Sequence, residues 1–224
     1  MLHLHISGRK GDPLWSSVQA LLHFDGADNA TTTVDQKGGS WTFRDSAKIS
    51  TPGKYGTARL NCTPGTGGRA WISGPTTVGQ FGSGDFTIES WVKTSNVHSY
   101  YALFDKYNGA SSGWQIYANN GYIGLYTDVD KGTATAGKLN DGQWHHLAIV
   151  RSGTTVKAYV DGVAVKTWTS INNNFTSATA FGIGGQVSTA GTYAAYTDYD
   201  DVRITAAARY LADFTPPSAA FPNQ

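Results

Sequence analysis

Carboxylates are the first side chains in this 224-residue sequence that could support catalysis. Hydrolysis of a glycosidic bond uses two of them, one as general acid and the other as nucleophile or base. Glu89 is the only glutamate in the chain, and no second acid follows it within residues 90–94. An aspartate pair from separate strands stays an alternative. The simpler prediction is that Glu89 makes hydrogen bonds across a sheet, as a partly buried carboxylate should.

Histidine and cysteine offer little further chemistry. His145 and His146 are adjacent, so in a strand they point to opposite faces and cannot easily hold one ion. His3 and His5 share a face, but two ligands make a weak metal site. Cys62 is the only cysteine, which excludes an intramolecular disulfide and a cysteine-based zinc site. A catalytic triad needs a histidine with a positioned serine or cysteine, and nucleophilic catalysis is not expected here.

Aromatic side chains suggest binding instead. Sugars bind exposed aromatic faces that are surrounded by a few fixed hydrogen-bonding groups, and loops on a rigid scaffold commonly carry such groups. Many aromatic residues lie in or beside the predicted loops, namely Tyr100, Tyr101, Tyr107, Trp114, Tyr193, Tyr196 and Tyr199. Most of them should be structural. We select Tyr101, Tyr107, Trp114 and Tyr193 as candidate ligand-binding residues on a surface that contacts a glycan or a protein.

The elements that must position these residues are β-strands. In residues 139–168, three runs rich in Val, Ile, Tyr and Trp are separated by Ser152-Gly153-Thr154 and by Asp161-Gly162. Asp-Gly readily adopts the positive backbone dihedrals of a type I′ turn, so we predict a three-stranded meander. Ala158, Val160, Val163 and Val165 flank this turn and should be buried together.

Composition supports an all-β fold. The chain has 27 glycines, 12% aromatic residues and only 15% charged residues, which favours strands and turns over exposed helices. A net charge of +1 without a basic cluster makes nucleic acid and anionic membranes unfavourable partners. The sequence has no long apolar stretch, and its start lacks a cleavage site, so we expect neither an export signal nor a membrane anchor.

Further strands are predicted along the chain from alternating apolar residues and turn signals. Residues 206–211 are the only plausible helix, and Trp71, Trp91 and Trp144 are predicted to be core residues. The predicted strands comprise residues 18–24, 41–43, 57–62, 70–72, 85–93, 101–105, 113–118, 122–127, 180–184 and 196–204.

Five ordered motifs carry a family resemblance. They are LLHFDG at 21–26, GDFTIESWVK at 84–93, DGQWHHLA at 141–148, YVDG at 159–162 and DDVRI at 200–204. Together they resemble the laminin G-like domains of the concanavalin A-like lectin/glucanase superfamily. The resemblance implies a jelly-roll sandwich of two antiparallel sheets with at most one short helix. Glucanase relatives carry an E-x-D-x-x-E-like run, which Glu89 does not complete.

The resemblance also implies calcium. Relatives bind a structural ion where the terminal strands pair, which here would use Asp25, Asp198, Asp200 and Asp201. Relatives also place calcium that contacts ligand at a loop rim, where this sequence has Asp128 and Asp130. We therefore include both as candidate ligand-binding residues, although turn capping explains that pair more simply.

Two flanks are similar to versions of this domain found in bacteriophage virion proteins, namely DPLW at 12–15 and ARYLADFTPP at 208–217. We expect an N-terminal arm at 1–17, in which residues 2–6 alternate as a strand, a jelly-roll domain at 18–214 and an extended tail at 215–224. The expected function is a non-catalytic binding and assembly module on a virion surface, in a tail, fibre or decoration protein that recognises host carbohydrate. The arm and tail would dock to other virion proteins, with homo-oligomers expected. A decoration protein without glycan binding and a glycan-active enzyme are the alternatives.

Overall fold

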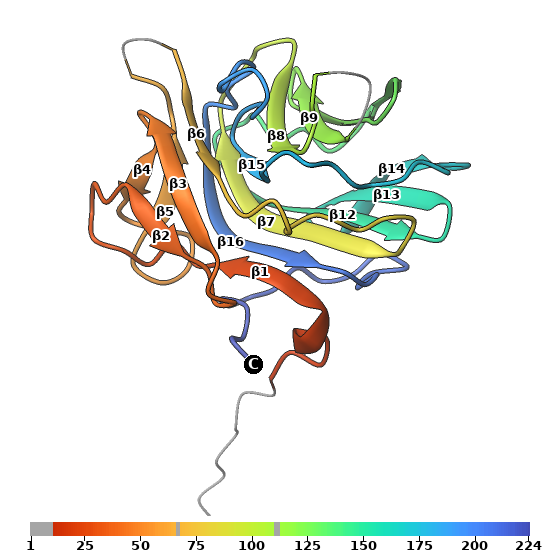
Figure 1. The fold of residues 1–224 in the computed structure, drawn as a ribbon, viewed down its shortest axis with the longest axis horizontal. Helices are drawn as coiled ribbons and strands as arrows, with labels where there is room; N and C mark the ends of the chain where they lie inside the picture. Colours follow the sequence, from red (N-terminus) through yellow and green to blue (C-terminus); the bar gives the residue numbers. More distant parts are fainter. Residues whose placement is uncertain (1–10, 66–67, 110–112) are drawn as a thin grey trace, which may run out of the picture.

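The computed structural model of the chain describes residues 11–65, 68–109 and 113–224. Two antiparallel sheets of eight strands each pack face to face and confirm the predicted jelly-roll sandwich (Figure 1). The predicted strand at residues 2–6 lies outside the described residues. Within the described part of the chain, the only helical segment is η1 (Trp15–Ser17), a single 3-10 turn. No helix there has the length and apolar character needed to cross a membrane.

The first sheet, which we call sheet A, contains the meander. As predicted, Asp161 and Gly162 have φ of 51° and 79°, which are the two positive values of a type I′ turn. Ala158 and Val160 are buried, but Val163 is 55% exposed because its strand is the edge of the sheet. The path through sheet A is β14 (Val163–Trp168), β13 (Thr155–Val160), β12 (Trp144–Ser152), β7 (Phe86–Thr94), β16 (Thr197–Thr205), β5 (Arg59–Cys62) and β4 (Lys48–Ser50), with β1 (Val18–Leu22) also paired to β16.

The second sheet, sheet B, covers the other side of the core. Its central strand β15 is only two residues long, yet it joins the two halves of the sheet through pairing with β8 and β6. The order is β11 (Asp130–Thr133), β10 (Tyr122–Tyr126), β9 (Gln115–Asn119), β8 (Tyr101–Asp105), β15 (Gly182–Ile183), β6 (Ala70–Ser73), β3 (Ser40–Asp45) and β2 (Thr32–Val34).

The core between the sheets is aromatic. Trp114 lies at its centre, with ring centroids 5.6 Å from Phe181 and 6.0 Å from Phe81. Of the tryptophans predicted to be core, Trp71 and Trp91 are buried but lie outside this central cluster, and Trp144 is only half-buried. Tyrosine and tryptophan rings therefore lie both in the core and on the outer faces of the sheets. Only those rings that are not buried can contact a ligand.

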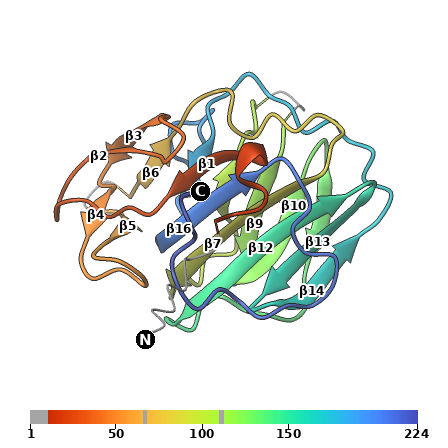
Figure 2. The ribbon, with the colours of Figure 1, turned by 90° about the horizontal axis from the view of Figure 1, so that it is seen from below.

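Chain segments from both ends cover the outer face of sheet A. Figure 2 shows the C-terminal segment crossing this face, with β1 beside it. Tyr210 and Phe214 pack on Tyr159 and Ala148 of the meander, while Phe221 packs on Leu21 of β1. The tail at 215–224 is thus held against its own sheet through Phe221, and its expected docking to neighbouring proteins stays a prediction.

Residues 206–211 are not helical, contrary to the sequence prediction. The backbone N–H of Arg209 donates to the Thr87 hydroxyl of β7 at 2.9 Å, which replaces an intrahelical hydrogen bond. The side chains of Arg209 and Tyr210 both reach Glu89 on sheet A. These tertiary contacts outweigh the helical preference of a short Ala-rich segment.

Candidate functional site

A tyrosine-lined pocket opens on the outer face of sheet B. Alternation positions its floor, because Ile116 and Ala118 of β9 point into the core while Gln115 and Tyr117 point outward. The pocket has a volume of about 360 Å³, and its lining residues come from β9, β10 and three loops. They are Tyr100, Tyr107, Gln115, Tyr126, Gln186 and Tyr193. We call these six residues the tyrosine pocket.

The rings of the tyrosine pocket meet at steep angles. Tyr100 and Tyr193 are 4.9 Å apart at 71°, and Tyr107 and Tyr126 are 5.3 Å apart at 83°. Such edge-to-face pairs are the favoured arrangement of aromatic rings, so the walls are pre-organised. Tyr193 is 49% exposed, which leaves it available to a ligand.

The ring of Tyr117 forms a second layer beneath the pocket and fixes the ring of Tyr100. Tyr117 lies beneath Tyr100 with ring centroids 4.5 Å apart and nearly parallel planes. A Cβ at Gly124 of β10 would lie 2.1 Å from Cζ of Tyr117, so only glycine allows the Tyr117 ring to lie against that strand. The Tyr117 hydroxyl donates to Asp130 Oδ1 at 2.5 Å. Strand alternation, a glycine and one carboxylate together hold the floor of the pocket rigid.

Polar groups inside the tyrosine pocket are connected to a buried carboxylate. The Tyr100 hydroxyl donates to Gln115 Oε1 at 2.5 Å, and Gln115 Nε2 donates to Asp105 Oδ1 at 2.7 Å. Burial raises the pKa of Asp105 to about 6, even though the N–H of Val187 also donates to it. Burial, followed by the charges of Asp130 and Asp105, raises the pKa of Tyr100 above its ordinary value. The phenol therefore stays protonated near neutral pH.

The structure separates the residues predicted to bind ligand into three groups. Tyr107 and Tyr193 line the tyrosine pocket. Tyr101 and Trp114 are fully buried in the core, so the prediction that they contact a ligand is wrong. Asp130 supports the floor of the pocket through Tyr117, whereas Asp128 forms a surface ion pair with Lys131 at 2.6 Å.

Several lining residues were missed from the sequence. Tyr100 was recognised as an aromatic residue near a loop but was not selected, and Gln115, Tyr126 and Gln186 were not considered. The signal was present in β9 and β10, where Gln115, Tyr117 and Tyr126 alternate with core residues. For Gln186, which lies in a loop, the sequence carries no comparable signal.

The four aspartates proposed to bind calcium do not form one site. Asp25 accepts hydrogen bonds from the N–H groups of Thr57 and Ala58, and Asp198 pairs with Arg59 at 2.8 Å. Within the described residues, no group of three or more acidic, histidine or cysteine side chains is placed to hold a metal.

The other two aspartates are also engaged by protein donors. Asp200 accepts from the N–H groups of Lys54 and Tyr55 at 2.6 and 2.9 Å, and Asp201 pairs with His23 and accepts from the N–H of Phe221. Calcium at this end of the fold would require these donors to be released. The residues therefore do not fit the implied ion, and no step of function is assigned to it.

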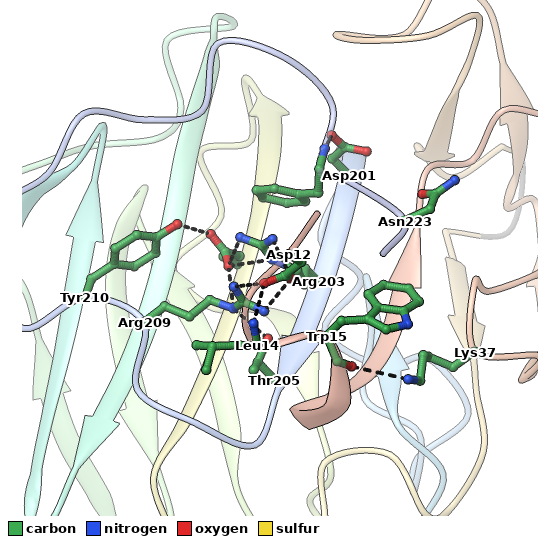
Figure 3. Close-up of polar contacts among 12 residues, drawn as sticks. Asp12, Leu14, Trp15, Lys37, Asp201, Arg203, Thr205, Arg209, Tyr210 and Asn223 are labelled. Carbon is green, nitrogen blue, oxygen red and sulfur yellow. Dashed lines mark hydrogen bonds and ion pairs between the residues drawn. The ribbon is translucent and has the colours of Figure 1, made fainter. Parts of the chain in front are cut away.

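Glu89 belongs to a buried charge network rather than to a cleft, and Figure 3 shows Asp12, Arg203, Arg209 and Tyr210 of this network. Its Oε1 accepts from Nε of Arg203 at 3.0 Å, and its Oε2 accepts from the Tyr210 hydroxyl at 2.8 Å. Asp12 Oδ2 accepts from Nη1 of Arg203 at 3.0 Å and from Nη2 of Arg209 at 2.7 Å. We call these five residues the terminal clasp, because they join both terminal segments to sheet A. Glu89 is fully buried there and faces no substrate cleft.

A β-bulge creates the alignment of the terminal clasp. In the pairing of β16 with β7, Asp200 lies opposite Trp91 but Arg203 lies opposite Glu89, so one extra residue is inserted between them. Asp201 has a φ of 50°, which is the local backbone change that accommodates this insertion. Without the bulge, Val202 rather than Arg203 would lie opposite Glu89, and the charge pair could not form.

The terminal clasp should make the free energy of unfolding depend on pH. Burial alone would raise the pKa of Glu89, but the charge of Arg203, the hydrogen bond and charge of His146 and the charge of Arg209 together outweigh it and lower the pKa to about 2. A lowered carboxylate pKa contributes stability that is present above the ordinary value and is lost as the pH falls through the folded value. We expect Glu89→Gln to lower the free energy of unfolding at pH 7 by about 3 kcal/mol. The difference from wild type should shrink between about pH 5 and pH 2.

Urea unfolding of both proteins across this pH range measures the difference. Asp28→Asn is the matched control, because the Asp28 side chain is exposed and its removal should give a small difference at every pH. A constant difference between wild type and Glu89→Gln over the whole range would contradict the role given to Arg203.

The histidine pair separates as predicted. His145 is near the surface and contacts Asp161 and Asp141 at 2.7 and 3.0 Å, while His146 is fully buried with its Nε2 3.4 Å from Glu89. Cys62 is also buried, and burial raises the pKa of its thiol well above the ordinary value. Neither group is presented to the tyrosine pocket.

Comparison with known proteins identifies the family. The model of the concanavalin A-like lectin/glucanases superfamily described as Laminin_G_3 matches residues 65–213, which is more than half of the chain. The chain therefore belongs to this superfamily, as the five sequence motifs predicted. No curated protein sequence matches it.

Solved structures with a similar fold include clostridial toxin domains. The binding domain of Paraclostridial Mosquitocidal Protein 1 has a TM-score of 0.69 at 11% identity over 88% of this chain and 50% of that chain. The binding domain of botulinum neurotoxin DC, in complex with rat synaptotagmin II, has a TM-score of 0.62 at 13% identity over 88% and 50%. The receptor binding domain of botulinum neurotoxin D has a TM-score of 0.60 at 12% identity over 88% and 51%. The chain spans about half the length of these structures, and identities this low establish the shared fold alone.

Proposed function

We propose that this chain is a non-catalytic binding module that recognises a glycan through the tyrosine pocket. The observation that carries the proposal is the pocket itself, in which four tyrosines and two glutamines line about 360 Å³ on a rigid sheet. Carbohydrate and small-molecule sites combine ring faces with a few fixed polar groups, and this pocket has both. Glutamine amides and phenol hydroxyls can each pair with sugar hydroxyls.

The location of Glu89 supports a function without catalysis. The superfamily includes glucanases, but the only glutamate of this chain is enclosed in the terminal clasp, with its charge balanced by arginine. A general acid needs a raised pKa and access to the glycosidic oxygen. Glu89 has a pKa lowered to about 2 and no exposed atoms, so it has neither property.

We further propose that the module belongs to a bacteriophage virion and binds host surface carbohydrate. The similarity of residues 12–15 and 208–217 to flanks of phage virion domains supports this context. These two flanks meet in the fold, where Asp12 pairs with Arg209 at 2.7 Å. Homo-oligomerisation and docking to other virion proteins are part of the same proposal, although most of the expected arm, residues 1–10, lies outside the described residues.

A glycan array with the full chain tests the binding function, followed by calorimetry with the glycan it retains. Truncating an aromatic residue at the centre of a binding site commonly costs 2 kcal/mol or more, so we expect Tyr193→Ala and Tyr107→Ala to weaken binding by about 30-fold. Both side chains are at least partly exposed, so the free energy of unfolding should change by less than about 0.5 kcal/mol.

Tyr122→Ala is the matched control. Tyr122 lies at the opposite end of β10 from Tyr126 and does not line the pocket, so its removal should leave binding unchanged. Retained binding in Tyr193→Ala and Tyr107→Ala would show that the ligand lies elsewhere. A folded wild-type protein that binds no glycan would favour the alternative of a decoration protein without carbohydrate recognition. Release of reducing ends from polysaccharide would overturn the proposal of a non-catalytic module.

A further inference from the structure

The charge distribution around the tyrosine pocket has a feature that binding of a neutral sugar does not require. Its six lining residues are tyrosines and glutamines, so none of them is an aspartate, glutamate, lysine, arginine or histidine. The nearest charges that act on its rings are carboxylates, since Asp130 accepts the hydrogen bond of Tyr117 and Asp105 accepts that of Gln115. The pocket is therefore an uncharged aromatic enclosure with negative charge behind its floor.

The nearby cations lie outside the pocket, although the charge of Lys106 acts on Asp105. Lys131 is paired with Asp128 at 2.6 Å on the surface. The ammonium of Lys106 donates to three backbone carbonyl oxygens, those of Thr76, Val78 and Thr179, at 2.8 to 2.9 Å. Neither lysine lines the pocket, so among residues 11–65, 68–109 and 113–224 no positive group faces the rings.

The hydrogen bonds also make the rings better partners for a cation. The hydroxyl of Tyr100 donates a hydrogen bond to Gln115. The hydroxyl of Tyr117, whose ring is stacked beneath Tyr100, donates a hydrogen bond to a carboxylate. A phenol that donates to an acceptor becomes more electron-rich, which strengthens attraction between its ring face and a positive charge. The steep ring angles, 71° for Tyr100 and Tyr193 and 83° for Tyr107 and Tyr126, present aromatic surface in more than one direction.

We propose that the tyrosine pocket binds an organic cation, specifically a quaternary ammonium group carried by the glycan ligand. Cages of aromatic rings recognise trimethylammonium groups because the cation is too bulky for close hydrogen bonds but is attracted to several ring faces at once. A volume of about 360 Å³ holds such a group together with the sugar to which it is attached. The inference rests on the proposed glycan-binding function and specifies the chemical group that the site reads.

The test uses choline chloride and its neutral isostere 3,3-dimethylbutan-1-ol, titrated into the full chain and followed by nuclear magnetic resonance. These compounds have nearly the same shape and differ in charge. We expect choline to bind at least about tenfold more tightly than the isostere, because only the cation gains from the ring faces and the carboxylates. Tyr193→Ala should weaken choline binding by about tenfold, whereas Tyr193→Phe should keep it within about twofold because the ring face remains. Tyr122→Ala is the control and should not change it.

Each other outcome has a defined meaning. Equal binding of choline and the isostere would overturn the inference, because the pocket would then recognise the shape of the ligand and not its charge. Choline binding that Tyr193→Ala does not weaken would place the cation elsewhere and also overturn it. If choline fails to bind but the array finds a neutral glycan whose binding needs Tyr193, the inference is wrong and the proposed function stands. If neither choline nor any glycan binds, both are wrong.

Discussion

Arg203→Met is expected to lower the free energy of unfolding by about 3–5 kcal/mol, because it removes one of the two arginines that neutralise two buried carboxylates and leaves only Arg209. Arg203 donates to Glu89 and Asp12, both almost completely buried, and its guanidinium also lies 3.8 Å from the centre of the Phe221 ring. Urea unfolding at pH 7 measures the change.

Arg69→Met is the matched control for that measurement. Arg69 is exposed and donates to the carbonyl of Ala190 at 2.8 Å, so its loss should cost less than about 0.5 kcal/mol. Arg203→Lys should recover only part of the lost stability, since lysine keeps the charge but cannot donate in a fork to two carboxylates. A change below about 1 kcal/mol in Arg203→Met would contradict the role of the terminal clasp as the element that holds both terminal segments.

Trp114→Ala should be as damaging, for a different reason. Trp114 is fully buried, and its ring lies within 6.4 Å of four phenylalanine rings, so the truncation leaves a large cavity. We expect a loss of about 3–5 kcal/mol in the free energy of unfolding. Trp114→Phe should cost much less, because it fills most of the space and removes a buried indole N–H that has no hydrogen-bond partner.

Comparison of Trp114→Ala with Tyr193→Ala distinguishes a core residue from a residue of the tyrosine pocket. That variant should keep its stability and lose ligand, whereas Trp114→Ala should lose stability. A Trp114→Ala protein that remained as stable as wild type but no longer bound glycan would restore Trp114 as a ligand-binding residue. Both variants can be measured by the same urea titration, with glycan binding determined below the unfolding transition.

The fold was largely predictable because its strongest signals are local. The Asp161-Gly162 turn and its alternating neighbours determine the meander without reference to the rest of the chain, and the structure contains all three strands. Three short strands were not predicted, namely β2, β4 and β11. They are edge or near-edge strands of three or four residues whose polar sequences resemble loops, and pairing with a neighbour rather than intrinsic preference makes them strands.

The candidate site was less predictable because it depends on the phase of each strand. Tyr100 and Tyr101 are adjacent in the sequence, yet one lines the pocket and the other is fully buried in the core. A shift of one residue in the start of β8 would exchange their roles, and aromatic content near a loop cannot decide between them. The β16 bulge has the same effect on the terminal clasp, since its extra residue turns Arg203 outward. Proximity of aspartates in the sequence suggested a calcium site. It did not show that protein hydrogen-bond donors already satisfy their carboxylates.

The terminal clasp also determines how the module can be mounted. The N–H of Asp12 donates to the carbonyl of Gln224, so the two ends of the described fold meet over the outer face of sheet A. The tyrosine pocket opens on the outer face of sheet B, on the opposite side of the sandwich. Polypeptide joined at either position would anchor the module by one face and leave the pocket pointing away from the anchor. Tension between the two joints would act on the terminal clasp and would not pass through the pocket.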